Sequence, residues 1–378
     1  MRAAGVNGMK ISRLSVFAFP VPFKVVFRHA SASRDRAENL IVACHGEDGG
    51  VGYGEGCPRQ YVTGETVPAG LAFIRAHADS FVADVRDLAS LRAWIDAHRD
   101  AIDCNPAAFC AMEIGALDLF GRASGQPLEE LVELPRLHGP FRYSGVLGDA
   151  PYPAYRWQLH RYRRRGFSDF KVKLSGNPAR DRRKMRALAG PSCSVRLDAN
   201  NLWASADDCI GHLAGLPGQP FAIEEPLGAG DLEGFRAVGE ALSMRVILDE
   251  SLARVEQLEA LPDPERWIVN LRVSKMGGIL RSIDLAKRAA SLGIATIVGC
   301  QVGETSILAR AALPVMRSVG SNLVAAEGAF GTWLLQRDLT TPSLTFGDAG
   351  QLEVLDVSRQ PGLGLTVRPE ELTPLERA

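Results

Sequence analysis

The sequence predicts an α/β barrel preceded by an α+β domain. Three observations carry this prediction: eight short apolar segments alternate with helical stretches after residue 140, charged residues recur where those segments end, and the first third reads as strands followed by helices. The chain has 378 residues, which exceeds the roughly 150 of an average domain and favours two domains.

The barrel prediction starts from the spacing of the apolar segments, whose first residues lie 22 to 29 positions apart. They are 141–146, 170–174, 194–198, 221–225, 245–249, 267–273, 295–300 and 322–326. This period is typical of a repeated strand–helix unit. An open doubly wound sheet is the rival, but the chain contains neither GxGxxG nor GxxxxGK[ST], the phosphate turns usual there.

The first third predicts a separate domain. Segments 11–19, 39–44 and 51–55 alternate like strands, and 23–35 reads as a polar, basic loop. From 67 to about 131 the pattern is helical, with one long helix beginning at Asn105-Pro106 and ending at Gly121 to Gly125.

Composition excludes several classes of function. Hydrophobic residues make up 46% and charged residues 23%, with a formal net charge of −1, so we expect no nucleic-acid or membrane partner. No apolar run reaches the ~18 residues of a membrane span, and residues 1–8 are too short and polar for a signal peptide. Seven cysteines without a CxxC pair are typical of a reduced, cytoplasmic protein.

Charged residues end five consecutive barrel strands in one register. From Lys173 the steps are 25 residues to Asp198, 26 to Glu224, 25 to Asp249 and 26 to Lys275. Charges at one level of a barrel are costly without partners, and catalytic groups lie at the carboxyl ends of barrel strands. A rim of structural salt bridges is the simpler interpretation for any one of these residues, but it explains the common register poorly.

The three carboxylates and two lysines point to one kind of chemistry. Adjacent carboxylates require a counter-charge, and an all-oxygen ligand set suits Mg²⁺. A lysine that is partly desolvated beside a cation has a lowered pKa and can act as a general base. The pattern therefore predicts removal of a proton next to a substrate carboxylate, with the metal stabilising the enediolate.

The motifs at these strand ends resemble those of a known family. The motifs at the strand ends are similar to those of the enolase superfamily, in its muconate lactonizing enzyme subgroup (mandelate racemase/muconate lactonizing enzyme family), and most similar to the dipeptide epimerase and N-acylamino acid racemase branch. They are Lys171-x-Lys173, Asp198-x-Asn200, Glu224-Glu225-Pro226, Asp249-Glu250-Ser251 and Asn270-x-Arg272-x-x-Lys275-x-Gly277-Gly278, with Gly52-Tyr53-Gly54-Glu55 near the N-terminus.

The resemblance implies a modified TIM barrel, (β/α)7β, with an α+β capping domain. The implied units are 9–130 for the capping domain, 140–340 for the catalytic barrel, and 341–378 for a C-terminal tail that returns to the capping domain.

The resemblance also implies roles for individual residues. Asp198, Glu224 and Asp249 would bind one Mg²⁺, and Lys173 and Lys275 would be the acid and base. Asn200 and Glu250 would support the metal ligands. The expected substrate-binding residues are Lys171, Arg28, Gln301, Glu304 and Glu327. Arg28 falls on the loop of the capping domain, and the last three follow strands seven and eight.

The expected function is an isomerase of a small-molecule carboxylate, most similar to a racemase or epimerase of an amino acid derivative or dipeptide, and we expect a homo-oligomer. Strand seven ends in Gly299-Cys300-Gln301 without the histidine of mandelate racemase relatives. Ala325-Ala326-Glu327 replaces the Asp-x-Asp usual in dipeptide epimerases. A cycloisomerase, a syn-dehydratase similar to o-succinylbenzoate synthase, and a non-catalytic scaffold are the alternatives.

Overall fold

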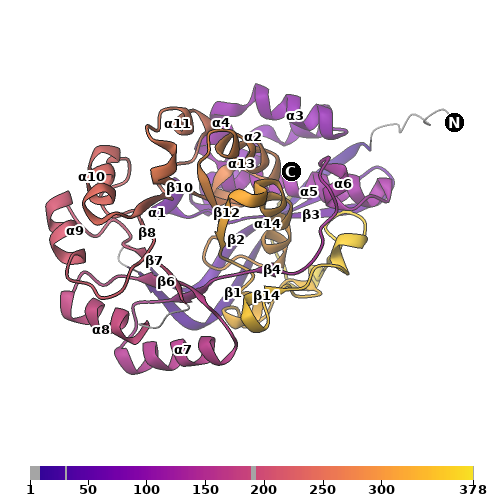
Figure 1. Ribbon diagram of the computed structural model, residues 1–378. Coiled ribbons are helices and arrows are strands. Elements are labelled where there is room, and N and C mark those ends of the chain that lie inside the picture. The colour runs from indigo at the N-terminus through magenta and orange to yellow at the C-terminus, as the bar shows by residue number, and fades with distance from the viewer. Residues whose placement is uncertain (1–8, 30–31, 189–192, 378) are drawn as a thin grey trace.

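The computed structural model describes residues 9–29, 32–188 and 193–377, so the segment 1–8 lies outside it. An eight-stranded parallel sheet and a four-stranded antiparallel sheet form its two main β-structures (Figure 1). None of the described helices is long and apolar enough to cross a membrane.

The parallel sheet contains the strands of the predicted barrel in sequence order. They are β5 (Gly145–Leu147), β6 (Asp169–Lys173), β7 (Ser194–Asp198), β8 (Ala222–Glu224), β9 (Arg245–Leu248), β10 (Trp267–Arg272), β11 (Ala295–Gly299) and β12 (Leu323–Ala326). The amide of Ser144 donates to the carbonyl of Ala326 at 2.8 Å, which joins the two edges of the sheet.

Helices connect each strand to the next and cover the sheet (Figure 1). They are α7 (Tyr152–Arg164), α8 (Pro178–Leu188), α9 (Ala206–Leu213), α10 (Leu232–Leu242), α11 (Val255–Glu259), α12 (Val273–Met276) with α13 (Ile279–Ser291), and α14 (Ser306–Val319). After β12 the chain forms the 3-10 turn η3 (Gly331–Trp333). The (β/α)7β prediction is therefore confirmed.

The antiparallel sheet has the order β16-β1-β2-β3. Its strands are β1 (Ile11–His29), β2 (Ala32–Gly46), β3 (Val51–Gly56) and β16 (Thr373–Arg377), so the end of the chain pairs with the N-terminal strands. The segment 23–35 was expected as a loop, but its described parts, 23–29 and 32–35, extend the β1–β2 hairpin. The register shifts after Pro22, and the ladder resumes with Phe27 opposite Arg34.

Six helices follow strand β3, and one of them, α5, is buried against the antiparallel sheet. They are α1 (Gln60–Thr63), α2 (Val67–Asp84), α3 (Leu88–Ala97), α4 (Arg99–Cys104), α5 (Pro106–Ser124) and α6 (Leu128–Leu131). Helix α5 begins at the predicted Asn105-Pro106 and is buried from Pro106 to Gly121. It packs directly on β3, because a Cβ added to Gly54 would lie only 2.1 Å from the carbonyl oxygen of Ala111.

Buried glutamates fasten the N-terminal elements to the barrel. Glu55 on β3 accepts hydrogen bonds from the amides of Thr305 and Leu308 at the start of α14. Glu113 on α5 accepts from the amides of Ile279 and Leu280 at the start of α13. Helix N-termini carry unsatisfied N–H groups and a partial positive charge, so each carboxylate caps a barrel helix from outside the barrel.

Two further differences from the predicted strands affect the site. The predicted strand 141–146 is divided: β4 (Phe141–Arg142) pairs with β14 (Gln351–Leu352) in the tail, and only β5 enters the barrel. Strand β10 ends at Arg272, so Lys275 lies in the short helix α12 rather than at a strand end. Gly277, at φ 79°, ends α12 in the left-handed conformation that glycine adopts without strain.

The remaining tail elements are short. They are β13 (Thr340–Thr341), which pairs with β15 (Thr366–Val367), the strand β14 introduced above, and the 3-10 turns η4 (Asp348–Gly350), η5 (Val357–Arg359) and η6 (Pro369–Glu371). The amides of Gly362 and Leu128 exchange hydrogen bonds with carbonyls of the opposite segment, namely those of Gln126 and Gly362. The tail therefore packs against the end of α5 and the start of α6.

Candidate active site

The five charged residues of the common register lie at one edge of the barrel sheet. Lys173 is the β-neighbour of Asp198, and Asp198 is the β-neighbour of Glu224. Asp249 follows β9 directly, and Lys275 follows β10 by one helical turn. All five are buried, so each charge needs a partner close by.

Lys171 on β6 lies between the first two carboxylates. Its Nζ is 2.7 Å from Oε2 of Glu224, 3.2 Å from Oδ2 of Asp198 and 3.2 Å from Oε2 of Glu327. Burial alone would lower the pKa of Lys171, but these three carboxylates raise it well above its usual value. Lys171 is therefore a permanent cation and is unsuited to accept a proton.

Lys173 lies two residues after Lys171 on β6, on the same face of the strand, and it also contacts Asp198. Its Nζ lies 2.9 Å from Oδ2 of Asp198 and 2.8 Å from Oδ1 of Asn200. The amide of Asn200 donates to Oδ1 of Asp198 at 3.1 Å. Burial would raise the pKa of Asp198, but Lys171 and Lys173 together lower it below its usual range. Asn200 therefore hydrogen-bonds both Lys173 and Asp198.

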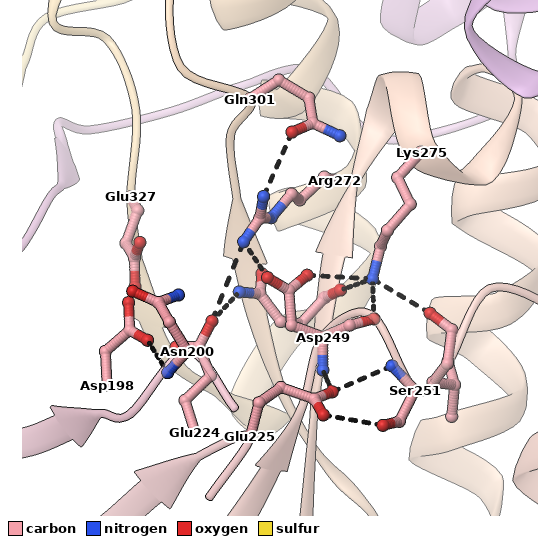
Figure 2. Close-up of polar contacts among 12 residues, drawn as sticks. Asp198, Asn200, Glu224, Glu225, Asp249, Ser251, Arg272, Lys275, Gln301 and Glu327 are labelled. Atoms are coloured by element: carbon pink, nitrogen blue, oxygen red, sulfur yellow. Dashed lines mark hydrogen bonds and ion pairs between the residues drawn. The ribbon is translucent and has the colours of Figure 1, made fainter. Parts of the chain in front are cut away.

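Asp249 binds two cations on the other side of the cluster (Figure 2). Nζ of Lys275 lies 3.1 Å from its Oδ1, and the guanidinium of Arg272 contacts its Oδ2. Lys275 also donates to the carbonyls of Asn270 and Leu252, both at 2.9 Å. Burial, followed by repulsion from Arg272, lowers the pKa of Lys275 to about 7. Lys275 is therefore able to exchange a proton near neutral pH.

Two residues support these carboxylates. Glu225, in the left-handed conformation at φ 41°, accepts hydrogen bonds from the amides of Asp249 at 2.7 Å and Ser251 at 2.9 Å (Figure 2). It therefore fixes the turn that carries Asp249. Nδ2 of Asn270 donates to Oε1 of Glu224 at 3.1 Å.

Glu250 was expected to support the metal ligands, and it follows Asp249 directly in the chain. Burial, together with the nearby Glu225 and Glu224, raises the pKa of its carboxyl to about 7. Burial at this position therefore favours the protonated form of Glu250 more than at an exposed glutamate.

The expected substrate-binding residues lie in different surroundings. Gln301 and Glu304 line a small pocket between the segments that follow β11 and β12, together with Cys300 and Phe330. Burial raises the pKa of Glu304 to about 8. Arg28 belongs to β1, where its backbone pairs with that of Ser33, and its side chain is outside the described part of the structure.

Glu327 is tied into the barrel interior. Its Oε1 lies 2.8 Å from Arg196 and its Oε2 lies 3.2 Å from Lys171. Burial would raise the pKa of Glu327, but these two cations lower it to about 2. Its charge is therefore already neutralised by two residues of the protein.

Among the described residues, no three histidine, cysteine, aspartate or glutamate side chains are placed to hold a metal ion. Lys171 lies against Asp198 and Glu224 here, and Arg272 lies against Asp249. The donor set itself fits Mg²⁺, since it consists of three buried carboxylates on consecutive strands. In addition, Oε2 of Glu224 is buried and accepts no hydrogen bond, although Nζ of Lys171 lies 2.7 Å from it. An oxygen atom in this situation is suited to bind a cation.

Arg196 and Arg272 are the residues of this site whose roles sequence reasoning missed. Side chains two positions apart on a strand share a face. Arg196 precedes Asp198 by two positions on β7, just as Lys171 precedes Lys173 on β6. This alternation was the available signal, and it places Arg196 inside the barrel beside Asp169 and Glu327.

The fold and the site together define an α/β-barrel enzyme with buried carboxylates and lysines at the carboxyl edge of its sheet. Residues 154–372 match the family model described as "Enolase C-terminal domain-like". The chain belongs to this family, and the resemblance to the enolase superfamily is confirmed.

Characterised relatives extend over nearly the whole chain. The L-Lys-D/L-Arg epimerase of Methylococcus capsulatus is 29% identical over 94% of this chain and 99% of its own. The N-succinyl-L-Arg/Lys racemase of Bacillus cereus is 24% identical over 97% of this chain and 98% of its own. The expectation of an isomerase of the racemase or epimerase kind is confirmed by these similarities.

A solved structure of an epimerase has a similar fold. The dipeptide epimerase of Enterococcus faecalis, complexed with Mg and the dipeptide L-Leu-L-Tyr, superposes with a TM-score of 0.80 at 25% identity, covering 95% of this chain and 100% of that one.

Proposed function

We propose that this chain is a Mg²⁺-dependent racemase or epimerase that removes and returns the α-proton of an amino acid derivative. The observation that carries the proposal is the position of two lysines on either side of three buried carboxylates. Lys173 lies on β6 and Lys275 follows β10, while Asp198, Glu224 and Asp249 come from the strands between them.

Each residue has a distinct task in this proposal. One lysine accepts the α-proton from one face of the α-carbon, and the other delivers a proton to the opposite face, so that one C–H bond breaks and one forms. Lys171, which stays protonated beside Asp198, Glu224 and Glu327, is proposed to add positive charge next to the substrate carboxylate. Mg²⁺ held by Asp198, Glu224 and Asp249 would supply the positive charge that stabilises the enediolate.

The substrate is proposed to have an acylated amino group. A free ammonium group would need a carboxylate that is not already paired, and Glu327 at the end of β12 is bound by Arg196 and Lys171. Gln301 and Glu304, which line the small pocket, are proposed to contact the rest of the substrate, and Arg28 to approach it from the capping side.

The setting of the enzyme is also proposed. We assign 9–130 and 341–378 to the cap and 140–340 to the barrel, supported by the pairing of β16 with β1. A cytoplasmic location is supported by seven cysteines that are all free thiols. Assembly as a homo-oligomer stays a prediction.

A screen for α-proton exchange tests the proposal. N-acyl amino acids, dipeptides and hydroxy acids would each be incubated with enzyme and Mg²⁺ in D₂O, and α-deuterium incorporation followed by ¹H NMR. We expect exchange with one class, lost on addition of EDTA. Exchange that is unaffected by EDTA, or turnover of a substrate without interconversion of its stereoisomers, would contradict the proposal.

A further inference from the structure

We propose that Arg272 is an internal competitor of the metal ion: its guanidinium binds the carboxylates of Asp249 and Glu224 and must leave Asp249 for Mg²⁺ to bind. This inference rests on the proposed function, which assigns these two carboxylates to Mg²⁺.

The position of Arg272 is the first argument. It is the last residue of β10, and its side chain points toward Glu224 and Asp249 (Figure 2). One of its nitrogens, Nη2, contacts Oδ2 of Asp249 and lies 3.8 Å from Oε1 of Glu224. A single cationic group therefore reaches two of the three proposed metal ligands.

The chemistry of the guanidinium is the second argument. Arginine keeps its charge at every pH at which a protein is folded, so Arg272 cannot withdraw by losing a proton. Its side chain is 11% exposed, and water screens charges weakly at such a site. Mg²⁺ and the guanidinium therefore compete for the same oxygen atoms, and the guanidinium has to move.

The structure also provides a second partner for the guanidinium. Nη1 of Arg272 donates to Oε1 of Gln301 at 3.1 Å, on the side away from Asp249 (Figure 2). Among the described residues, Nε of Arg272 and Nε2 of Gln301 are buried without hydrogen-bond partners. Gln301 is therefore a partner that the guanidinium can keep when it leaves Asp249.

Isothermal titration calorimetry with Mg²⁺ alone tests this competition. The variants are Arg272→Met, which removes the charge, and Arg272→Lys, which keeps it. Arg266→Met is the control, because Arg266 precedes the other end of β10 and is 41% exposed. We expect Arg272→Met to bind Mg²⁺ about fivefold or more tightly than wild type, Arg272→Lys to stay near wild type, and the control to be unchanged.

Thermal unfolding in EDTA and in saturating Mg²⁺ provides a readout that does not need activity. Without its cation, the Arg272→Met protein should unfold at a lower temperature than wild type in EDTA, and Mg²⁺ should raise its Tm by more than it raises that of wild type. This comparison remains informative even if the variant is too unstable for calorimetry.

Two results would be decisive against parts of this account. If Arg272→Met binds Mg²⁺ with unchanged or weaker affinity while remaining folded, Arg272 is a support of the metal ligands and the competition is refuted. If wild type itself does not bind Mg²⁺, the proposed function fails first, so the two failures are distinguishable.

Discussion

Nζ of Lys171 lies 2.7 Å from Oε2 of Glu224, across two strand ends of the barrel. With the ion pair between Lys171 and Asp198, it places one buried cation of the protein against two of the proposed metal ligands. Lys171, Asp198 and Glu224 are all buried, so each of these charges would be costly without an opposite charge beside it.

The first prediction concerns the metal ligands. Asp198→Asn, Glu224→Gln and Asp249→Asn should each weaken Mg²⁺ binding about 100-fold or more, because each removes a charged oxygen ligand. Calorimetric titration measures the effect, with the exposed Asp263→Asn as a control. Wild-type affinity in all three variants would place the metal elsewhere.

The second prediction concerns pH. With the pKa of Lys275 lowered to about 7 by burial and by Arg272, the fraction of neutral Lys275 rises steeply with pH below that value and approaches one above it. In the direction in which Lys275 is the base, kcat/KM should therefore increase about tenfold per pH unit below 7 and level off above it. Measuring both directions from pH 5.5 to 9 checks this, and a flat profile across pH 7 would exclude Lys275 as the base.

The third prediction concerns the substrate. Because Glu327 is neutralised by Arg196 and Lys171, N-acyl amino acids should be turned over at least about tenfold better, in kcat/KM, than dipeptides with a free amino group. Matched pairs that differ only in acetylation of the amino group make the comparison. Preference for the free amine would mean that the site offers another carboxylate to it.

The fourth prediction concerns the attachment of the cap. Glu55→Ala should destabilise the protein by about 3 kcal/mol, because it leaves the donors of Thr305, Leu308 and Asn39 without their acceptor. Chemical denaturation measures this, and the exposed Glu47→Ala serves as the control. Equal stability of the two variants would show that Glu55 does not hold the cap to α14.

The sequence was sufficient to predict the barrel, because strand spacing and charged strand ends are local features that parallel pairing brings to one edge. Lys173, Asp198 and Glu224 follow this rule and are β-neighbours. Lys275 does not follow this rule, because β10 ends at Arg272 and Lys275 lies in the short helix α12 that precedes Gly277.

Features that depend on distant pairing were beyond the sequence. The β1–β2 hairpin beyond Pro22 exists because Phe27 pairs with Arg34 across a polar segment that reads locally as a loop. Similarly, β4 leaves the barrel because it pairs with β14 in the tail, more than 200 residues further along the chain. Local composition carries no signal for either pairing.

The most direct test of the two-lysine account is α-proton exchange in D₂O, followed by NMR with each enantiomer of a substrate and with Lys173→Ala and Lys275→Ala. Each lysine should serve one face, so both variants should lose racemisation. Lys275→Ala should still exchange the enantiomer that faces Lys173, and Lys173→Ala the opposite one. If either variant still racemises the substrate, or both exchange the same enantiomer, the two-lysine account is contradicted.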